Sequence, residues 1–144
     1  MRTTFIKTLD KLAEGDRRIM LLTGDLGFTV FEAFRDRYPR QFINVGVAES
    51  NMMSIAAGLA LTGKIVFAYS IATFATLRPL EQIRNDIASH HARVCVVGTG
   101  GGLSYSDASI THHAMEDIAL MRVIPNMTVL CPGDPIEAAW ATRT

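Results

Sequence analysis

The sequence predicts an α/β protein with a mostly parallel sheet and helices on both faces. Short runs that are apolar on both faces alternate with segments of helical periodicity. A parallel sheet covered by helices needs such strands, whereas an antiparallel sheet with one wet face does not. With 144 residues, 49% of them hydrophobic, the chain is long enough for one well-packed core. We therefore expect a single domain over residues 1–144.

The first expected elements alternate from helix to strand. Residues 3–14 place apolar side chains at helical spacing and stop at Gly15, before the buried run IMLLT at 19–23. A helix is expected over 28–38, ended by Pro39, and a strand over 41–45. ESNMMSIAAGLAL predicts a helix over 49–61, and KIVFAY predicts a strand over 64–69.

The second half continues this alternation. The pattern predicts a helix over 77–91, a strand over 93–98, a short helix over 114–124, a strand over MTVLC at 127–131 and a helix from 134. Because no strand follows the last helix, we expect a domain shortened at its C-terminus. Cys95 and Cys131 lie in two strand-like runs and are expected to be buried free thiols.

Charge and hydropathy exclude several classes of protein. Fourteen basic and fourteen acidic residues cancel, so the positive field that drives binding to nucleic acids or anionic membranes is absent. No apolar run is long enough for a membrane span, and Lys7 and Asp10 stand where a signal peptide needs an apolar segment. We expect a cytoplasmic protein without nucleic-acid or membrane partners.

Glu49 is the residue that most needs an explanation. NVGVAESNM at 44–52 joins a strand to a helix with one carboxylate at the junction, and the ten residues that follow contain no other ionisable group. Ligand sites of open parallel sheets lie at the carboxyl ends of the strands, so the loops 24–27, 46–49, 70–74 and 98–113 are expected to carry the chemistry. Taken alone, Glu49 is either a functional acid or a cap for the helix beginning at Ser50.

A glycine-rich turn after the strand 93–98 offers a competing interpretation. GTGGGLSYS could cradle phosphates, as in a Rossmann-type nucleotide-binding domain. The match is poor, because Leu103 stands where the fingerprint that starts at Gly98 needs its third glycine, and a polar loop follows in place of a helix. Binding of NAD(H) would favour this alternative.

Four motifs in a fixed order carry a family resemblance. GDLG at 24–27, FINVGVAESNM at 42–52, YSIATFATLRPLEQIRNDI at 69–87 and THHAMEDIALMRVIPNMTVLCPGDP at 111–135 resemble the pyrimidine-binding domain of transketolase-type thiamine diphosphate enzymes. The last motif looks more like split transketolases than like 1-deoxyxylulose-phosphate synthases or 2-oxoacid dehydrogenases. The resemblance implies a transferase that moves a two-carbon ketol unit between sugar phosphates.

The resemblance also assigns roles to four residues. Glu49 matches the acid that hydrogen-bonds N1′ of the aminopyrimidine ring and so helps the cofactor's own 4′-amino group remove the thiazolium C2 proton. Asp25 matches an acid near the thiazolium, Phe74 an aromatic wall against the pyrimidine, and His112 a catalytic histidine that faces the substrate. The residues alone leave three other interpretations open: a helix cap for Asp25, a core side chain for Phe74 and a surface position for His112.

Several positions depart from the family pattern. Ile71 stands where a second aromatic residue is common, and His113 stands where glutamine is common. Ala108 and Ser109 replace the glycine-flanked acid that usually precedes the substrate-facing histidine, which leaves the particular sugar open. His90 and His91 are expected to be solvated and not to form a metal site.

The GDG motif that holds the metal and the diphosphate in this family has no counterpart in the chain. The resemblance implies that Mg²⁺ or Ca²⁺ is held by a diphosphate-binding N-terminal subunit or domain, without which the chain is expected to be inactive. The small residues of 49–61 permit close helix packing, so we also expect a homo-oligomer. A noncatalytic homologue that serves as an interaction module is the alternative.

Overall fold

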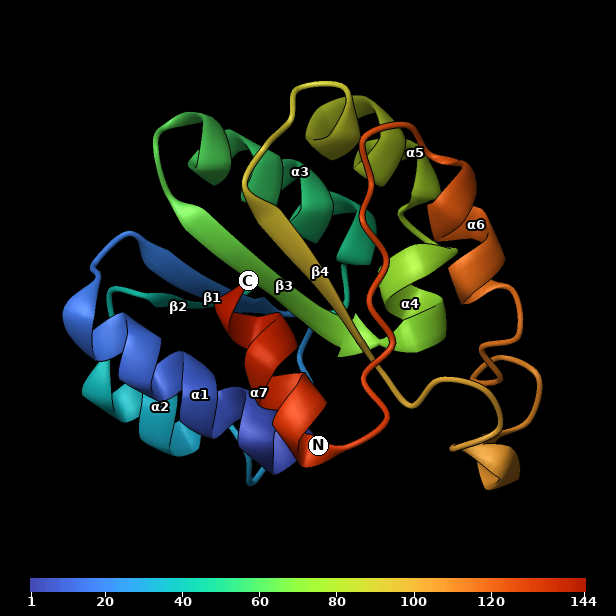
Figure 1. The fold of residues 1–144 in the computed structure, drawn as a ribbon, viewed down its shortest axis with the longest axis horizontal. Helices are drawn as coiled ribbons and strands as arrows, with labels where there is room; N and C mark the ends of the chain where they lie inside the picture. Colours follow the sequence, from blue (N-terminus) through green and yellow to red (C-terminus); the bar gives the residue numbers. More distant parts are fainter.

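The computed structural model describes residues 1–144, which fold around a four-stranded sheet (Figure 1). The strands β1 (Ile19–Thr23), β2 (Phe42–Asn44), β3 (Ile65–Ile71) and β4 (Val94–Thr99) lie in the order β2-β1-β3-β4. All three pairings are parallel, with Leu21 opposite Phe42 and Phe67, and Phe67 opposite Cys95. The predicted α/β fold with a parallel sheet is therefore confirmed.

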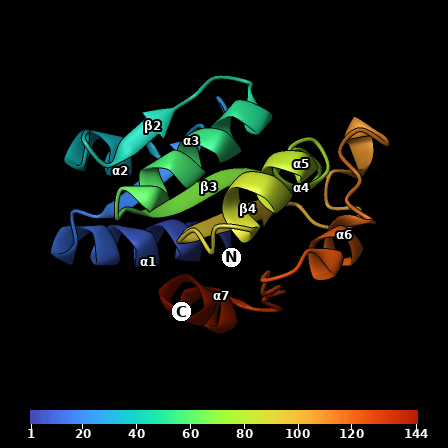
Figure 2. The same ribbon diagram turned by 90° about the horizontal axis from the view of Figure 1, so that it is seen from above.

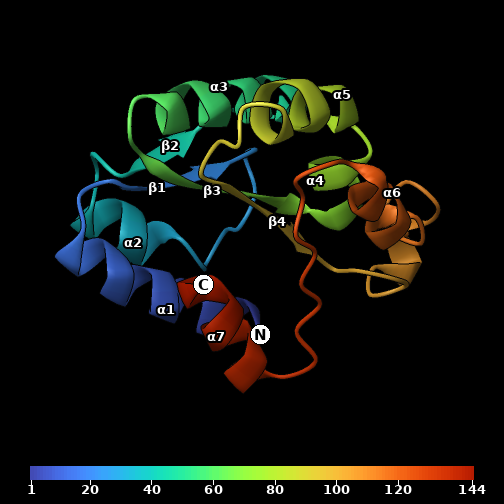
Figure 3. The ribbon, with the colours of Figure 1, turned by 45° about the horizontal axis from the view of Figure 1, so that its top comes forward.

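Helices cover both faces of the sheet. Figure 3 shows α3 (Glu49–Leu61) and α5 (Leu80–Gln82) on one side, and α1 (Arg2–Gly15) and α2 (Glu32–Arg37) on the other. The last helix, α7 (Pro135–Arg143), packs against α1, and Figure 2 shows it on the side of α1 away from the sheet. The short helices α4 (Ala72–Thr76) and α6 (Asp117–Val123) contact each other, and α4 also contacts β4. No helix combines the length and apolarity that crossing a membrane requires.

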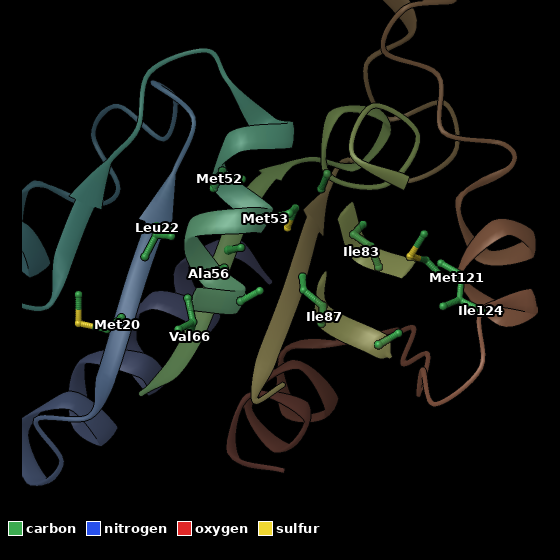
Figure 4. Close-up of a cluster of buried hydrophobic side chains, with 14 residues drawn as sticks. Met20, Leu22, Met52, Met53, Ala56, Val66, Ile83, Ile87, Met121 and Ile124 are labelled. Atoms are coloured by element: carbon green, nitrogen blue, oxygen red, sulfur yellow. The ribbon is translucent and has the colours of Figure 1, made fainter. Parts of the chain in front are cut away.

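Two apolar cores lie on opposite faces of the sheet. Figure 4 shows the first, in which side chains of β1 and β3 meet Met52, Met53 and Ala56 of α3 and residues from the segment after α5 and from α6. The second joins β1 and β3 to α1 and α2, and contains Phe5, Phe31 and Tyr69. All five residues of β1 are buried, which explains why this strand is apolar on both faces. The Tyr69 hydroxyl has no hydrogen-bond partner, and burial raises the pKa of Tyr69 above its ordinary value.

The predicted strand at 127–131 is wrong. Met127 and Val129 pack against the first core, so the sequence does alternate between inward and outward side chains. The segment nevertheless makes no ladder with β4, and the backbone N–H of Met127 donates instead to the carbonyl of Ile124, at 3.4 Å. An alternating pattern reports which side chains are buried, not whether a neighbouring backbone is paired.

The expectation of two buried thiols is also wrong, since Cys95 and Cys131 are both exposed. Cys131 belongs to the unpaired segment just described. Cys95 lies on β4, an outer strand of the sheet, where only β3 flanks it. An apolar run on an edge strand is covered less completely than the same run at the centre of a sheet.

Other elements differ from the prediction in extent. The helix expected over 28–38 is limited to α2, at Glu32–Arg37. The helix expected over 77–91 is the short α5 followed by a π-helical segment, η1 (Ile83–Ala88), which places Ile83 and Ile87 in the core. The sequence predicted only a loop at 70–74, where β3 runs directly into α4.

Candidate active site

The four loops predicted to carry chemistry follow the carboxyl ends of the four strands. They begin at Gly24 after β1, at Val45 after β2, at α4 after β3 and at Gly100 after β4. Because all strands are parallel, these loops meet at one edge of the sheet, where α4 follows the arrowhead of β3 in Figure 1. Each of the four candidate site residues lies on or beside one of these loops.

Glu49 is the first residue of α3 and is only 1% exposed. The N-cap of α3 is Ala48, and the hydrogen bonds of the Glu49 side chain go to Arg78 and Ser70, so the interpretation of Glu49 as a helix cap is wrong. The Nη1 atom of Arg78 donates to Oε2 at 2.8 Å, and Ser70 Oγ donates to Oε1 across a long 3.5 Å. Oε1 therefore keeps most of its capacity to accept a hydrogen bond.

Gly24 leaves room beside this less engaged oxygen. A Cβ atom added to Gly24 would lie 3.6 Å from Oε1 of Glu49 and 3.4 Å from the carbonyl oxygen of Gly46. The backbone at the end of β1 thus approaches the carboxylate without a side chain between them. A planar group that reaches Oε1 needs such an opening.

Arg78 is a site residue that the sequence analysis missed. It lies between α4 and α5, and its guanidinium carbon is 4.1 Å from the centroid of the Phe74 ring. A buried carboxylate requires a partner, and Arg78 is a basic residue in the loop motif that also carries Phe74. The need of a buried carboxylate for a cation could have pointed to a basic residue near Glu49, but the sequence alone does not show which one pairs with it.

Phe74 and His112 lie together. Phe74 is half-buried on α4, and its ring meets the His112 ring edge-on with 5.0 Å between centroids. Tyr105 adds a second edge-on contact to His112 at 6.0 Å. The loop is tied down where Thr73 Oγ1 donates to the carbonyl of Thr111 at 3.0 Å. The contacts therefore run without a break from Glu49 through Arg78 and Phe74 to His112.

Asp25 lies at the same edge but contacts a different partner. Its backbone N–H donates to Oδ1 of Asn44 at 2.9 Å, and Nδ2 of Asn44 donates back to Oδ1 of Asp25 at 3.0 Å. Asp25 does not cap α2, which begins only at Glu32. The reciprocal pair ties the end of β1 to the end of β2 and holds Asp25 at a φ of +57°. Asn44 is therefore a second residue that the sequence analysis missed.

A surface pocket of about 130 Å³ adjoins Asp25. Glu32 is one of the residues that line this pocket. The backbone N–H of Thr29 donates to Oε1 of Glu32 at 2.7 Å, and this hydrogen bond holds the pKa of Glu32 below its ordinary value. The pocket is lined by Thr23, Asp25, Leu26, Gly27, Phe28, Phe31, Glu32, Arg35, Phe42 and Asn44. A larger pocket of about 220 Å³, between η1 and Pro125, contains none of the candidate site residues.

The remaining sequence features contribute little to this edge. His90 and His91 are exposed, and no group of three or more His, Cys, Asp or Glu side chains could hold a metal ion. The glycine-rich segment after β4 leads into a three-residue 3₁₀ turn, η2 (Ser106–Ala108), and not into a helix. It therefore offers phosphate groups no helix N-terminus, which a Rossmann-type site requires.

Comparison with known proteins identifies the family. The family model of the transketolase pyrimidine binding domain matches residues 1–144. The chain is 44% identical to a putative transketolase C-terminal section of Methanocaldococcus jannaschii, covering 100% of this chain and 46% of that protein. It is 38% identical to an apulose-4-phosphate transketolase subunit of Phocaeicola vulgatus, covering 92% of this chain and 43% of that protein.

A solved structure agrees with these relatives. A split-gene transketolase, described as an inactive beta4 tetramer, superposes with a TM-score of 0.87 at 37% identity, covering 99% of this chain and 45% of that chain. The chain thus spans less than half the length of each of these three proteins. By the family model, the relatives and the fold, the chain belongs to the transketolase family and matches its pyrimidine-binding domain.

Proposed function

We propose that this chain supplies the pyrimidine-binding half of a thiamine diphosphate-dependent transketolase-type site. The observation that carries the proposal is Glu49, a carboxylate that is 1% exposed at the carboxyl edge of the sheet and does not cap its own helix. Burying an acid is costly, so a protein keeps one at such a place only if its proton or charge is used or well paired.

The residues present fit an aminopyrimidine ring. Oε1 of Glu49 has one long hydrogen bond, Gly24 leaves space beside it, and the half-buried Phe74 offers an aromatic face. Bound thiamine diphosphate would supply the nucleophilic carbon and the electron sink for cleaving a bond next to a ketose carbonyl. In our proposal Glu49 holds a shared proton at the ring nitrogen, Phe74 stacks against the ring, and Asp25 faces its cationic part.

His112 is proposed to contact the sugar. It is partly exposed, it lies against Phe74, and Thr111 Oγ1 lies 2.9 Å from its Nδ1 atom. A histidine held in this way can donate a hydrogen bond to a substrate oxygen on which charge develops. We propose a sugar phosphate as the substrate, in keeping with the apulose-4-phosphate transketolase subunit among the relatives.

The proposed site is completed by another polypeptide or domain. The chain contains no metal-binding cluster, and one relative is named as a single subunit of a transketolase, which supports a partner that holds Mg²⁺ or Ca²⁺ and the diphosphate. The similar split-gene transketolase is an inactive beta4 tetramer, which supports self-association of this chain and a need for that partner. A noncatalytic interaction module would not need a buried, incompletely bonded acid.

The test is Glu49→Gln in the assembly with its diphosphate-binding partner. Glutamine keeps the size of the side chain but cannot hold the shared proton, so exchange of the cofactor's C2 proton for deuterium should slow. Losing a charge-assisted hydrogen bond worth about 3 kcal/mol corresponds to roughly a 100-fold slower exchange. NMR of both assemblies, saturated with cofactor, measures this rate.

Glu81→Gln is the matched control, because Glu81 is an exposed acid on α5. It should exchange like the wild type. Equal exchange rates in wild type and Glu49→Gln would show that the assigned role of Glu49 is wrong.

A further inference from the structure

Arg78 contacts both residues that the proposed function assigns to the cofactor's ring, although on Glu49 it occupies Oε2 and leaves Oε1 open. Its Nη1 atom donates to Oε2 of Glu49 at 2.8 Å, and its guanidinium carbon lies 4.1 Å from the centroid of Phe74. A guanidinium is planar, donates N–H groups to carboxylates and stacks on aromatic rings. An aminopyrimidine ring is also planar, stacks on aromatic faces and forms hydrogen bonds with a carboxylate. The two groups thus seek the same partners.

The backbone around Arg78 is fixed, so this placement is not that of a free surface side chain. The carbonyl oxygen of Arg78 accepts from Ser50 Oγ at 3.3 Å, and its N–H donates to the carbonyl of Thr73 at 3.4 Å. Ser50 follows Glu49 on α3, and Thr73 precedes Phe74 on α4. Arg78 is therefore anchored beside both of its side-chain partners.

The two ends of the ion pair differ in burial. The side chain of Glu49 is 1% exposed, whereas that of Arg78 is 46% exposed. An unpaired carboxylate at the position of Glu49 is costly, while a half-exposed guanidinium can turn into water at little cost. If the pair opens, Arg78 is the side chain that moves.

We propose that Arg78 holds the place of the aminopyrimidine ring on Glu49 and Phe74, and is displaced when the ring binds. The inference rests on the proposed function, because it needs a cofactor that uses these two residues. It makes Arg78 a residue that satisfies the buried acid until the cofactor arrives and that weakens cofactor binding in doing so. In the opposite arrangement, Arg78 stays on Oε2 as an anchor and supports binding of the ring to Oε1.

Arg78→Met separates these arrangements, because methionine keeps part of the stem but has no guanidinium. The assembly with the partner is titrated with thiamine diphosphate and Mg²⁺ by calorimetry, and its melting temperature is measured without the cofactor. Displacement predicts a lower melting temperature without the cofactor and a Kd that is roughly five- to tenfold tighter than in the wild type. An unchanged or weaker affinity in Arg78→Met would overturn the inference.

Two further variants sharpen the test. Arg84→Met removes an exposed guanidinium whose hydrogen bond goes to the neighbouring Asn85, so it should change neither quantity. Arg78→Lys retains a cation for Glu49 but not a planar group for Phe74. It should therefore lower the melting temperature without the cofactor less than Arg78→Met does, and it should tighten cofactor binding less. If Arg78→Met does not fold, an affinity of Arg78→Lys no tighter than the wild type overturns the inference instead.

A double variant tests whether the tighter cofactor binding expected of Arg78→Met depends on Glu49. In a Glu49→Gln background, Arg78→Met should tighten binding less than it does beside the native acid, because the guanidinium has lost its carboxylate and competes with the ring only on Phe74. Failure of the wild-type assembly to bind thiamine diphosphate would overturn the proposed function and this inference together. Binding by the wild type without tightening in Arg78→Met would overturn this inference alone.

Discussion

Gly27 shows how a single residue shapes the loop that carries Asp25. It adopts a φ of +86°, and a Cβ atom added there would lie 2.2 Å from Cε2 of Phe31. Phe31 cannot give way easily, because it is 3% exposed and meets the ring of Tyr69 edge-on at 4.8 Å. Both the left-handed backbone conformation and the lack of room for a Cβ atom therefore favour glycine at this position. The GDLG motif is weak as a sequence signature but has a clear structural reason.

Gly27→Ala should lower the free energy of unfolding by roughly 2–4 kcal/mol, since it adds left-handed backbone strain to overpacking against Phe31. Urea denaturation followed by circular dichroism measures the change. Gly58→Ala is the control, because Gly58 lies inside α3 with open space around it, and alanine there should stabilise the helix by up to about 1 kcal/mol. A Gly27→Ala protein as stable as the wild type would contradict this interpretation of the loop.

Among the elements, α7 has the clearest start signal in both sequence and structure. Asp134 is its N-cap and accepts from the backbone N–H of Glu137 at 2.8 Å, while Glu137 Oε2 accepts from the N–H of Gly133 at 2.7 Å. Pro135 occupies the first turn, where its lost N–H costs nothing. Local rules fix such a helix, which explains why its start at 134–135 could be predicted.

Asp134→Ala should remove this cap and cost about 1 kcal/mol of stability, measured by thermal or urea unfolding. Glu116→Ala is a suitable comparison, because Glu116 occupies the N-cap of α6 without any capping hydrogen bond from its side chain. That variant should unfold like the wild type. A similar loss in both variants would mean that the cap of α7 contributes nothing of its own.

Elements that depend on distant partners were predicted less well. MTVLC at 127–131 has the composition of a strand, but its backbone finds no neighbour in the sheet. The helix expected over 77–91 changes to π-helical bonding at η1, where the backbone N–H of Ser89 donates to the carbonyl of Arg84, five residues back. Periodicity in the sequence fixes which side chains point inward, and the tertiary contacts decide the hydrogen bonding of the backbone.

At the scale of the whole molecule, the parallel sheet gathers residues that are far apart in the chain. The position of Glu49, Asp25, Phe74 and His112 at one edge could be predicted, because a parallel sheet places its strand ends together. The partners of these residues could not be predicted. Arg78 reaches Glu49, and Asn44 reaches Asp25, through side-chain contacts across 29 and 19 residues of sequence that no local pattern encodes.

The source of the metal ion is also a property of the whole molecule. No group of His, Cys, Asp or Glu side chains in the chain could hold an ion, and Mg²⁺ and Ca²⁺ need several oxygen ligands around one point. A cation that bound the native chain at 100 times its Kd would stabilise it by about 2.7 kcal/mol, which is easily seen as a higher melting temperature. We therefore expect neither millimolar Mg²⁺ or Ca²⁺ nor a chelator to change the melting temperature of this chain alone. In the assembly with the proposed partner, the same chelator should abolish binding of thiamine diphosphate, and added Mg²⁺ should restore it. Stabilisation of the isolated chain by either cation would instead place a metal site on this chain and remove the main reason for assigning the metal to a partner.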